Sequence, residues 1–252
     1  MFEHTTYPIV IAHKGASAYA PENTIAAFKL AIQQGADAIE LDAKLSLDGT
    51  VVVIHDQTLE RTTDGTGNVR DYSVANLKEF DAGIFFDEMF RGERIPTLNE
   101  VFETIGDKVV INVELTNYAT PLDDLPYKVA DLIKTHKLEQ RIICSSFNPV
   151  ALFRTKKVIP DLPIGLLAFP GRKGWWIREF GRWFPIQALH PCIQDIDNIL
   201  IEKYHKHGIQ VFCYTVNDPE KLRMLCGWNI NGIFTDDPPL AIQIASEFKD
   251  RS

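Results

Sequence analysis

Short apolar runs alternate with longer amphipathic runs along almost the whole chain. The apolar runs are rich in Ile, Val, Leu and Phe, which is typical of buried parallel strands. We expect eight such strands, at residues 9–13, 38–43, 109–115, 141–145, 163–168, 187–190, 210–216 and 232–235. The amphipathic runs predict helices at residues 25–33, 98–105, 125–135, 149–158, 199–207, 219–225 and 239–248. This alternation predicts an α/β protein with the architecture of a (β/α)8 TIM barrel.

One interval departs from the alternation. It lies between a predicted hairpin strand at residues 51–55 and Ile95, and it is rich in Gly, Asp, Thr and Asn. Such a segment is too long and too rich in turn-forming residues for a simple connection. We therefore expect residues 57–95 to form a small insertion that caps the barrel mouth, within one domain covering residues 1–252.

The composition narrows the classes of function. The chain has 252 residues, of which 45% are hydrophobic and 24% charged, as in an ordinary globular domain. Its net charge of −8 argues against a general nucleic-acid binder or a binder of anionic membranes. A phosphate group on a ligand would therefore be bound by local groups and a metal rather than by a basic surface.

The chain shows no targeting pattern. Residues 1–8 have neither the basic nor the apolar segment of a signal peptide, and no stretch is long enough to span a bilayer. The cysteines lie in apolar segments without Cys-x-x-Cys spacing, so we expect buried, reduced thiols at Cys144, Cys192, Cys213 and Cys226. These features favour a cytoplasmic protein, and they leave its oligomeric state open.

The most informative chemistry lies on a predicted β-hairpin. Glu40 and Asp42 are two residues apart on an apolar strand, so their side chains share one face. An Asp-Gly turn then returns the chain to His55, which can lie beside them. Glu114, on a different apolar strand, can supply a third carboxylate. Three carboxylates without a Cys or His cluster predict a site for one divalent cation, Mg²⁺ or Ca²⁺, in preference to Zn²⁺.

Two histidines accompany the predicted metal site. His13 ends the first predicted strand, at the edge where α/β barrels bind ligands, and His55 ends the hairpin. Two imidazoles can divide the proton transfers of phosphodiester cleavage, one as base and one as acid. Either histidine alone would be compatible with a structural role, but their position beside the carboxylates predicts catalysis.

The chain resembles the glycerophosphodiester phosphodiesterases, a family of phosphatidylinositol-phosphodiesterase-like TIM barrels. The resemblance covers nearly the whole sequence and depends on ordered blocks that include His13-Lys-Gly, Pro21-Glu-Asn-Thr, Glu40-Leu-Asp, Asp48-Gly, His55-Asp, Ile95-Pro-Thr-Leu, Asn112-Val-Glu, Ser145-Ser-Phe, Thr215-Val-Asn and Thr235-Asp. It implies metal-dependent hydrolysis of small glycerophosphodiesters, such as glycerophosphocholine or glycerophosphoethanolamine, to sn-glycerol 3-phosphate and an alcohol. It also implies that the neighbouring glycerol hydroxyl is the nucleophile, giving a cyclic phosphate that water then opens.

Two positions depart from the family pattern. Lys14 stands where the family usually has arginine, and Thr116 stands where a lysine commonly follows the third carboxylate. Lysine keeps the charge but loses the bidentate fork, and threonine keeps neither. We expect Lys14 to contact the substrate phosphate.

Further polar residues lie at predicted strand ends. We expect Asn112, Ser146 and Tyr214 to bind substrate, Tyr214 as an aromatic wall where the family usually has tryptophan. For Ser146 and Asn112, and for His190, Asn217 and Asp236, a structural hydrogen bond or a loop cap is an equally good interpretation.

The segment at residues 169–184 combines four cations with aromatic residues. It is compatible with a helix packed on the barrel, a lid over the substrate, or weak lipid contact through residues 175–183. A lysophospholipase D that holds an acyl chain with this segment is therefore a second hypothesis. A non-catalytic barrel that binds phosphodiesters is a third, and the presence of both histidines and all three carboxylates argues against it.

Overall fold

The computed structural model describes residues 8–248. Residues 1–7, in which we expect no targeting signal, lie outside the described residues. Eight parallel strands form a sheet that closes on itself, because β1 pairs with both β9 and β2. These strands are β1 (Ile9–Ala12), β2 (Ala38–Leu45), β4 (Val110–Leu115), β5 (Ile142–Ser146), β6 (Ile164–Ala168), β7 (Ala188–Pro191), β8 (Gln210–Cys213) and β9 (Gly232–Thr235). The predicted (β/α)8 barrel is confirmed.

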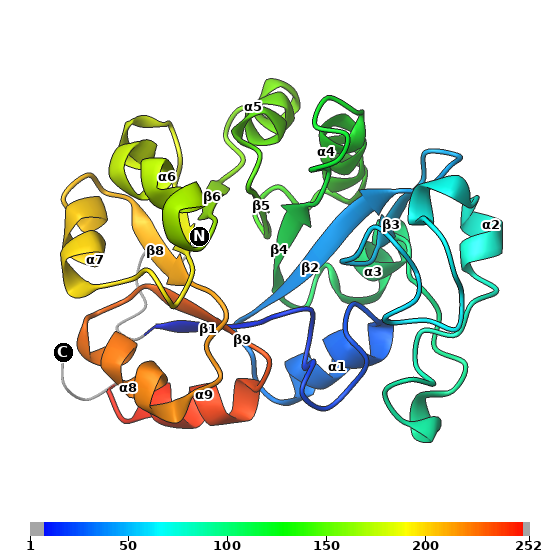
Figure 1. Ribbon diagram of the computed structural model, residues 1–252, viewed down its shortest axis with the longest axis horizontal. Coiled ribbons are helices and arrows are strands. Elements are labelled where there is room, and N and C mark those ends of the chain that lie inside the picture. The colour runs from blue at the N-terminus through cyan, green and yellow to red at the C-terminus, as the bar shows by residue number, and fades with distance from the viewer. Residues whose placement is uncertain (1–7, 249–252) are drawn as a thin grey trace.

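Helices surround the strands (Figure 1). They are α1 (Ile25–Gln33), α3 (Leu98–Ile105), α4 (Leu125–His136), α5 (Pro149–Val158), α6 (Trp175–Phe180), α7 (Asn198–His205), α8 (Pro219–Gly227) and α9 (Pro238–Ser246). Local sequence sets their starts. Thr24 caps α1 by accepting a hydrogen bond from the Ala27 N–H, and Thr97 forms a capping box with Glu100 at α3. Among the strands and helices that we predicted, β8 differs most at one end, because it ends at Cys213 rather than at residue 216.

The alternation of side chains along the strands separates two apolar layers. Ile39, Leu41 and Ala43 of β2 point outward into the large cluster between the strands and the helices. A smaller cluster fills the barrel interior and contains Ile9, Ile11, Ala38, Ile143, Ala188, Phe212 and Phe234. Such layers of side chains make the interior of a TIM barrel a packed core, so polar side chains further along the same strands lie nearer its carboxyl end.

The hairpin and the segment after it form a side structure on the barrel. Strand β3 (Val51–Val53) pairs antiparallel with β2, and then come η1 (Val69–Asp71), α2 (Val74–Leu77) and η2 (Glu88–Phe90). Helix α2 lies beside β3 at the edge of the molecule (Figure 1). The segment has an apolar cluster of its own, formed by Val52, Ile54, Leu59, Val69, Leu77, Ala82 and Ile95. This cluster anchors the insertion to the back of the hairpin.

The aromatic segment contains more helix than the sequence suggests. It forms η3 (Gly171–Gly174), α6 and η4 (Gly181–Trp183). Ile177 is buried, whereas Trp175, Trp176 and Trp183 are exposed. The packed-helix interpretation therefore holds for one face of α6 only.

No helix within residues 8–248 is long and apolar enough to cross a membrane. All four cysteines are buried, as expected.

Candidate active site

A cavity of about 260 Å³ lies at the carboxyl ends of the barrel strands. It brings together residues from all eight barrel strands or the segments directly after them, and from the loop after β3. Its lining residues include His13, Lys14, Glu40, Asp42, His55, Asn112, Glu114, Ser145, His190 and Tyr214. The structure thus places all the predicted metal-ligating and acid/base residues around one cavity.

Three buried carboxylates form one cluster in this cavity. Glu40 and Asp42 project from β2, and Asp42 is directly opposite Glu114 in the register between β2 and β4. One oxygen from each carboxylate lies within 4.8 Å of the others. Burial and the neighbouring acids raise the pKa of Glu40 well above its ordinary value, and burial and Asp42 raise the pKa of Glu114 to about 8. Such a cluster needs a bound cation to hold all three groups in the charged form.

Neighbouring groups orient each carboxylate. The Lys14 backbone N–H donates to Glu40 over 2.8 Å, from a backbone with φ of 57°. The Asn23 side-chain amide donates to Asp42 over 2.8 Å, and its oxygen accepts from the Asp42 N–H. The Tyr118 hydroxyl donates to Glu114. These contacts fix the oxygens that face the cavity.

Each predicted catalytic histidine is held by a carboxylate. His13 Nδ1 lies 2.7 Å from Asp236, and His55 Nδ1 lies 2.6 Å from Asp56. Burial would raise the pKa of Asp236, but its hydrogen bonds with His13, Asn217 and Ser17, together with the charge interaction with His13, outweigh that effect and lower the pKa to about 2. An ionised carboxylate at Nδ1 places the proton there and leaves Nε2 as the nitrogen available for proton transfer.

A charged chain connects the two sides of the cavity. The Lys14 ammonium lies 3.1 Å from Glu22, and Arg61 donates to Glu22 over 2.6 and 2.8 Å and also to Asp56. Burial lowers the pKa of Lys14, but Asp42, Glu22 and Glu40 outweigh it and raise the pKa. Lys14 therefore stays charged at the cavity, although one of its donors is used by Glu22.

The other predicted substrate contacts divide into two groups. Asn112 lines the cavity, and its side-chain oxygen is buried without a partner. Tyr214 lines it through its ring, because its hydroxyl donates to the Ala168 carbonyl. Ser146 does not line the cavity. Its hydroxyl donates to the Leu115 carbonyl and accepts from the Asn148 N–H.

Ser145 takes the place in the cavity that we expected for Ser146. Strand residues alternate between faces, and Ser145 is in register with Glu114. The assignment of Ser146 to the substrate site is therefore corrected by one residue, and Ser145, which accepts a hydrogen bond from Asn112, is the serine at the cavity.

His190 occupies the floor of the cavity between Phe212 and Phe234. Burial lowers its pKa to about 3, so it is neutral. Asn217 lies outside the cavity wall and donates to Asp236 over 2.6 Å. Neither residue belongs to the carboxylate cluster.

Sequence reasoning missed the partners of the predicted residues. Asp56 and Asn23 were visible within motifs, but their roles depend on contacts that spacing alone does not give. Lys44, two residues after Asp42, also escaped notice. Its ammonium donates to the Thr116 carbonyl and hydroxyl, both over 3.1 Å. A cation thus reaches residue 116 from the adjacent strand.

The chain matches a family model described as the glycerophosphoryl diester phosphodiesterase family over residues 13–240. It is 44% identical over 237 residues, 94% of this chain and 97% of the relative, to a glycerophosphodiester phosphodiesterase of Caldanaerobacter subterraneus. Its structure is similar to that of an Oleispira antarctica phosphodiesterase in complex with the product sn-glycerol-3-phosphate. That comparison gives a TM-score of 0.83 and 32% identity, and covers 96% of this chain and 97% of the other. The structure of a Thermotoga maritima glycerophosphodiester phosphodiesterase gives a TM-score of 0.75 and 31% identity, and the comparison covers 96% of this chain and 100% of the other.

Proposed function

The chain belongs to the glycerophosphoryl diester phosphodiesterase family and is a phosphodiesterase, and we propose that it hydrolyses glycerophosphodiesters by metal-dependent catalysis with two histidines. The substrates are small deacylated phospholipids, such as glycerophosphocholine or glycerophosphoethanolamine, and the products are sn-glycerol 3-phosphate and an alcohol. The observation that carries this proposal is that three clustered carboxylates line the same cavity as two histidines, each of which faces a further carboxylate of its own.

Glu40, Asp42 and Glu114 would hold one divalent cation. All three offer oxygen, the ligand of Mg²⁺ and Ca²⁺, and no histidine or cysteine belongs to the cluster within residues 8–248. The unpartnered oxygen of Asn112 is a further neutral oxygen facing the same cavity. When bound, the cation would neutralise the developing negative charge on the phosphoryl oxygens.

His13 and His55 divide the proton transfers. One Nε2 takes the proton from the glycerol hydroxyl next to the phosphate as that oxygen forms its bond to phosphorus. The other gives a proton to the alcohol oxygen as its bond to phosphorus breaks. Water then opens the cyclic phosphate with the two roles reversed, which restores both histidines. Asp236 and Asp56 keep the imidazoles in the required tautomer throughout.

An assay of sn-glycerol 3-phosphate release from glycerophosphocholine tests this proposal. We expect activity in the presence of Mg²⁺ or Ca²⁺, its loss in excess EDTA and its return when the cation is restored. Activity that persists unchanged in excess EDTA would contradict the metal-dependent mechanism.

A lysophospholipase D is the second candidate, because Trp175, Trp176 and Trp183 are exposed on a helical segment above the barrel. Exposed aromatic side chains can bind an acyl chain or a lipid surface. Choline release from lysophosphatidylcholine, compared with release from glycerophosphocholine, separates the two activities. A higher kcat/KM for the lysolipid, lost when Trp176 and Trp183 are replaced by alanine, would favour this candidate.

A further inference from the structure

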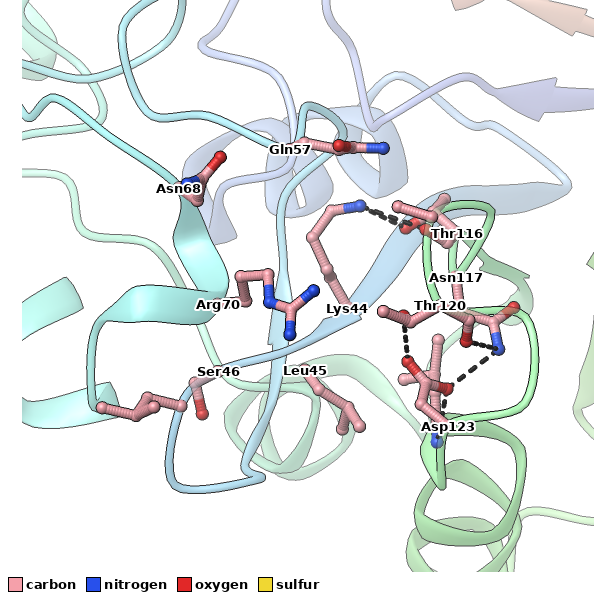
Figure 2. Close-up of a pocket in the computed structure, with 13 residues that line it drawn as sticks. Lys44, Leu45, Ser46, Gln57, Asn68, Arg70, Thr116, Asn117, Thr120 and Asp123 are labelled. Carbon is pink, nitrogen blue, oxygen red and sulfur yellow. Dashed lines mark hydrogen bonds between the residues drawn. The ribbon is translucent and has the colours of Figure 1, made fainter.

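A second cavity, of about 250 Å³, is formed around the end of β2 and the segment after β4 (Figure 2). It is lined by polar side chains from the hairpin, the insertion and the loop after β4, together with a few apolar ones. Its polar lining residues are Lys44, Ser46, Gln57, Asn68, Arg70, Thr116, Asn117, Thr120 and Asp123. Figure 2 shows Asn68 and Arg70 on one side, the loop from Thr116 to Asp123 on the other, and Lys44 between them.

Three residues that line this cavity each follow a lining residue of the active site by two positions. Asp42 lines the first cavity and Lys44 the second, and Glu114 and Thr116 are related in the same way. His55 and Gln57 repeat this relation in the loop after β3. Residues two positions apart on a strand share a face and are separated by about 6.6 Å. A ligand whose phosphate lies at the carboxylates can therefore extend into the second cavity.

The second cavity carries two cationic side chains, Lys44 and Arg70, and Lys44 also lies within electrostatic range of Asp42, Glu114, Asp56 and Asp123. Lys44 donates only to the neutral oxygens of Thr116, and neither Lys44 nor Arg70 takes part in an ion pair within residues 8–248. Asp123 is the one acid in the lining. Its oxygens already accept from the Asn117 amide, the Thr120 hydroxyl and the Leu125 N–H, over 2.6 to 3.1 Å.

We propose that this cavity binds the alcohol portion of the substrate and selects polyhydroxylated or anionic alcohols over quaternary ammonium alcohols. The proposal rests on the proposed function, because it assumes that the phosphodiester occupies the first cavity. Within the substrates of the proposed function, it names the preferred ones: glycerophosphodiesters of polyols, such as glycerol and inositol, are cleaved more efficiently than glycerophosphocholine.

The chemistry of the lining supports this selection. Hydroxyl groups can accept hydrogen bonds from Lys44 and Arg70 and can exchange hydrogen bonds with the amides of Gln57 and Asn68. A trimethylammonium group can neither donate nor accept a hydrogen bond, and it carries the same charge as Lys44 and Arg70. The lining contains one carboxylate, that of Asp123, whose oxygens already accept hydrogen bonds, and no aromatic residue to hold a quaternary ammonium group.

The test compares kcat/KM for glycerophosphoinositol, glycerophosphoglycerol and glycerophosphocholine, all followed by release of sn-glycerol 3-phosphate. The variants are Arg70→Glu and Lys44→Met. The matched control is Arg141→Glu, because Arg141 is exposed and precedes β5 at the opposite end of the barrel.

We expect the native enzyme to prefer the two polyol substrates by about tenfold or more, the scale of one or two charge-assisted hydrogen bonds. Arg70→Glu should reduce this preference by about tenfold, mainly through KM. Lys44→Met should act in the same direction, and Arg141→Glu should leave the ratio unchanged. Arg70 is exposed, so its replacement should leave the circular dichroism spectrum unchanged.

The test distinguishes failure of the proposed function from failure of the proposed alcohol subsite. A native enzyme that cleaves none of the three substrates would overturn the proposed function itself. An active enzyme with no polyol preference, or an Arg70→Glu variant in which all three kcat/KM values change equally, would overturn the alcohol subsite and leave the proposed function standing.

Discussion

At the scale of single residues, the two histidines are distinguished from ordinary buried histidines by their partners. His13 faces Asp236 and His55 faces Asp56, whereas His190 has no hydrogen-bond partner for either ring nitrogen. We predict that His13→Ala and His55→Ala each reduce kcat by about 10²–10⁴, as expected for positioned acid/base groups. Steady-state kinetics checks this, with circular dichroism as the control for folding.

The double variant His13→Ala/His55→Ala should lose less than the product of the single losses, since both groups act in one scheme of proton transfer. If either single variant had a nearly normal kcat, the histidine replaced in it would have a structural role and not a catalytic one.

Lys14 provides the second prediction at this scale. Its ammonium pairs with Glu22 but lines the cavity, and a phosphate could accept from its remaining N–H groups. We expect Lys14→Met to raise KM and lower kcat, whereas Lys14→Arg keeps most activity and can bind phosphate in bidentate fashion. Unchanged kinetics of Lys14→Met on several phosphodiesters would show that the lysine serves only to hold Glu22.

At the scale of elements, hydrophobic periodicity was sufficient to predict the eight barrel strands and most of the helices. The spacing of Glu40 and Asp42 on β2 correctly predicted that they share a face. At β5 we expected Ser146 from its position at a predicted strand end, and sequence alone does not say which of two adjacent serines faces inward. That choice is set by the register with β4, which places Ser145 opposite Glu114.

The partners of the site residues could not be read from element patterns. Asp236 reaches His13 from the other end of the chain, across the β1–β9 pairing that closes the barrel. The Lys44 contact with Thr116 likewise depends on β2 and β4 being neighbours. Both contacts depend on which strands are neighbours in the sheet, which periodicity predicts only as an overall architecture.

Strand β6 provides a prediction about packing. A Cβ at Gly165 would lie 2.4 Å from His190 Nε2, so the glycine makes room for that buried ring. We expect Gly165→Ala to destabilise the fold by about 1–3 kcal/mol, the usual cost of overpacking. Thermal unfolding measures this.

Gly227→Ala at the end of α8 is the matched control, because nothing lies within 4 Å of a Cβ there. Equal melting temperatures for the native protein and the Gly165→Ala variant would show that the floor of the cavity tolerates the change.

At the scale of the whole molecule, the carboxylate cluster should make stability depend on pH and on the metal. The pKa of Glu114 is about 8 in the folded chain without metal, against 4.5 ordinarily, so the folded state retains a proton that the unfolded state releases. The contribution of Glu114 to the stability of the metal-free protein should therefore be complete below about pH 4.5. It should be lost as the pH rises to about 8.

Melting temperatures measured between pH 5 and pH 9 with EDTA and with Mg²⁺ or Ca²⁺ check this prediction. Because the cation competes with the proton, the metal-bound protein should lose less stability with rising pH. Glu114→Gln should reduce the difference between the two curves. Identical curves with and without the cation would contradict the prediction.

The most direct test of the account is a titration of metal-free enzyme with Mg²⁺ or Ca²⁺, in which bound metal and sn-glycerol 3-phosphate release are measured on the same samples. The account predicts that activity rises in proportion to the occupancy of one site per chain, and that Glu114→Gln lowers metal affinity and activity together. Full activity of the native enzyme or of Glu114→Gln with no metal bound would contradict it.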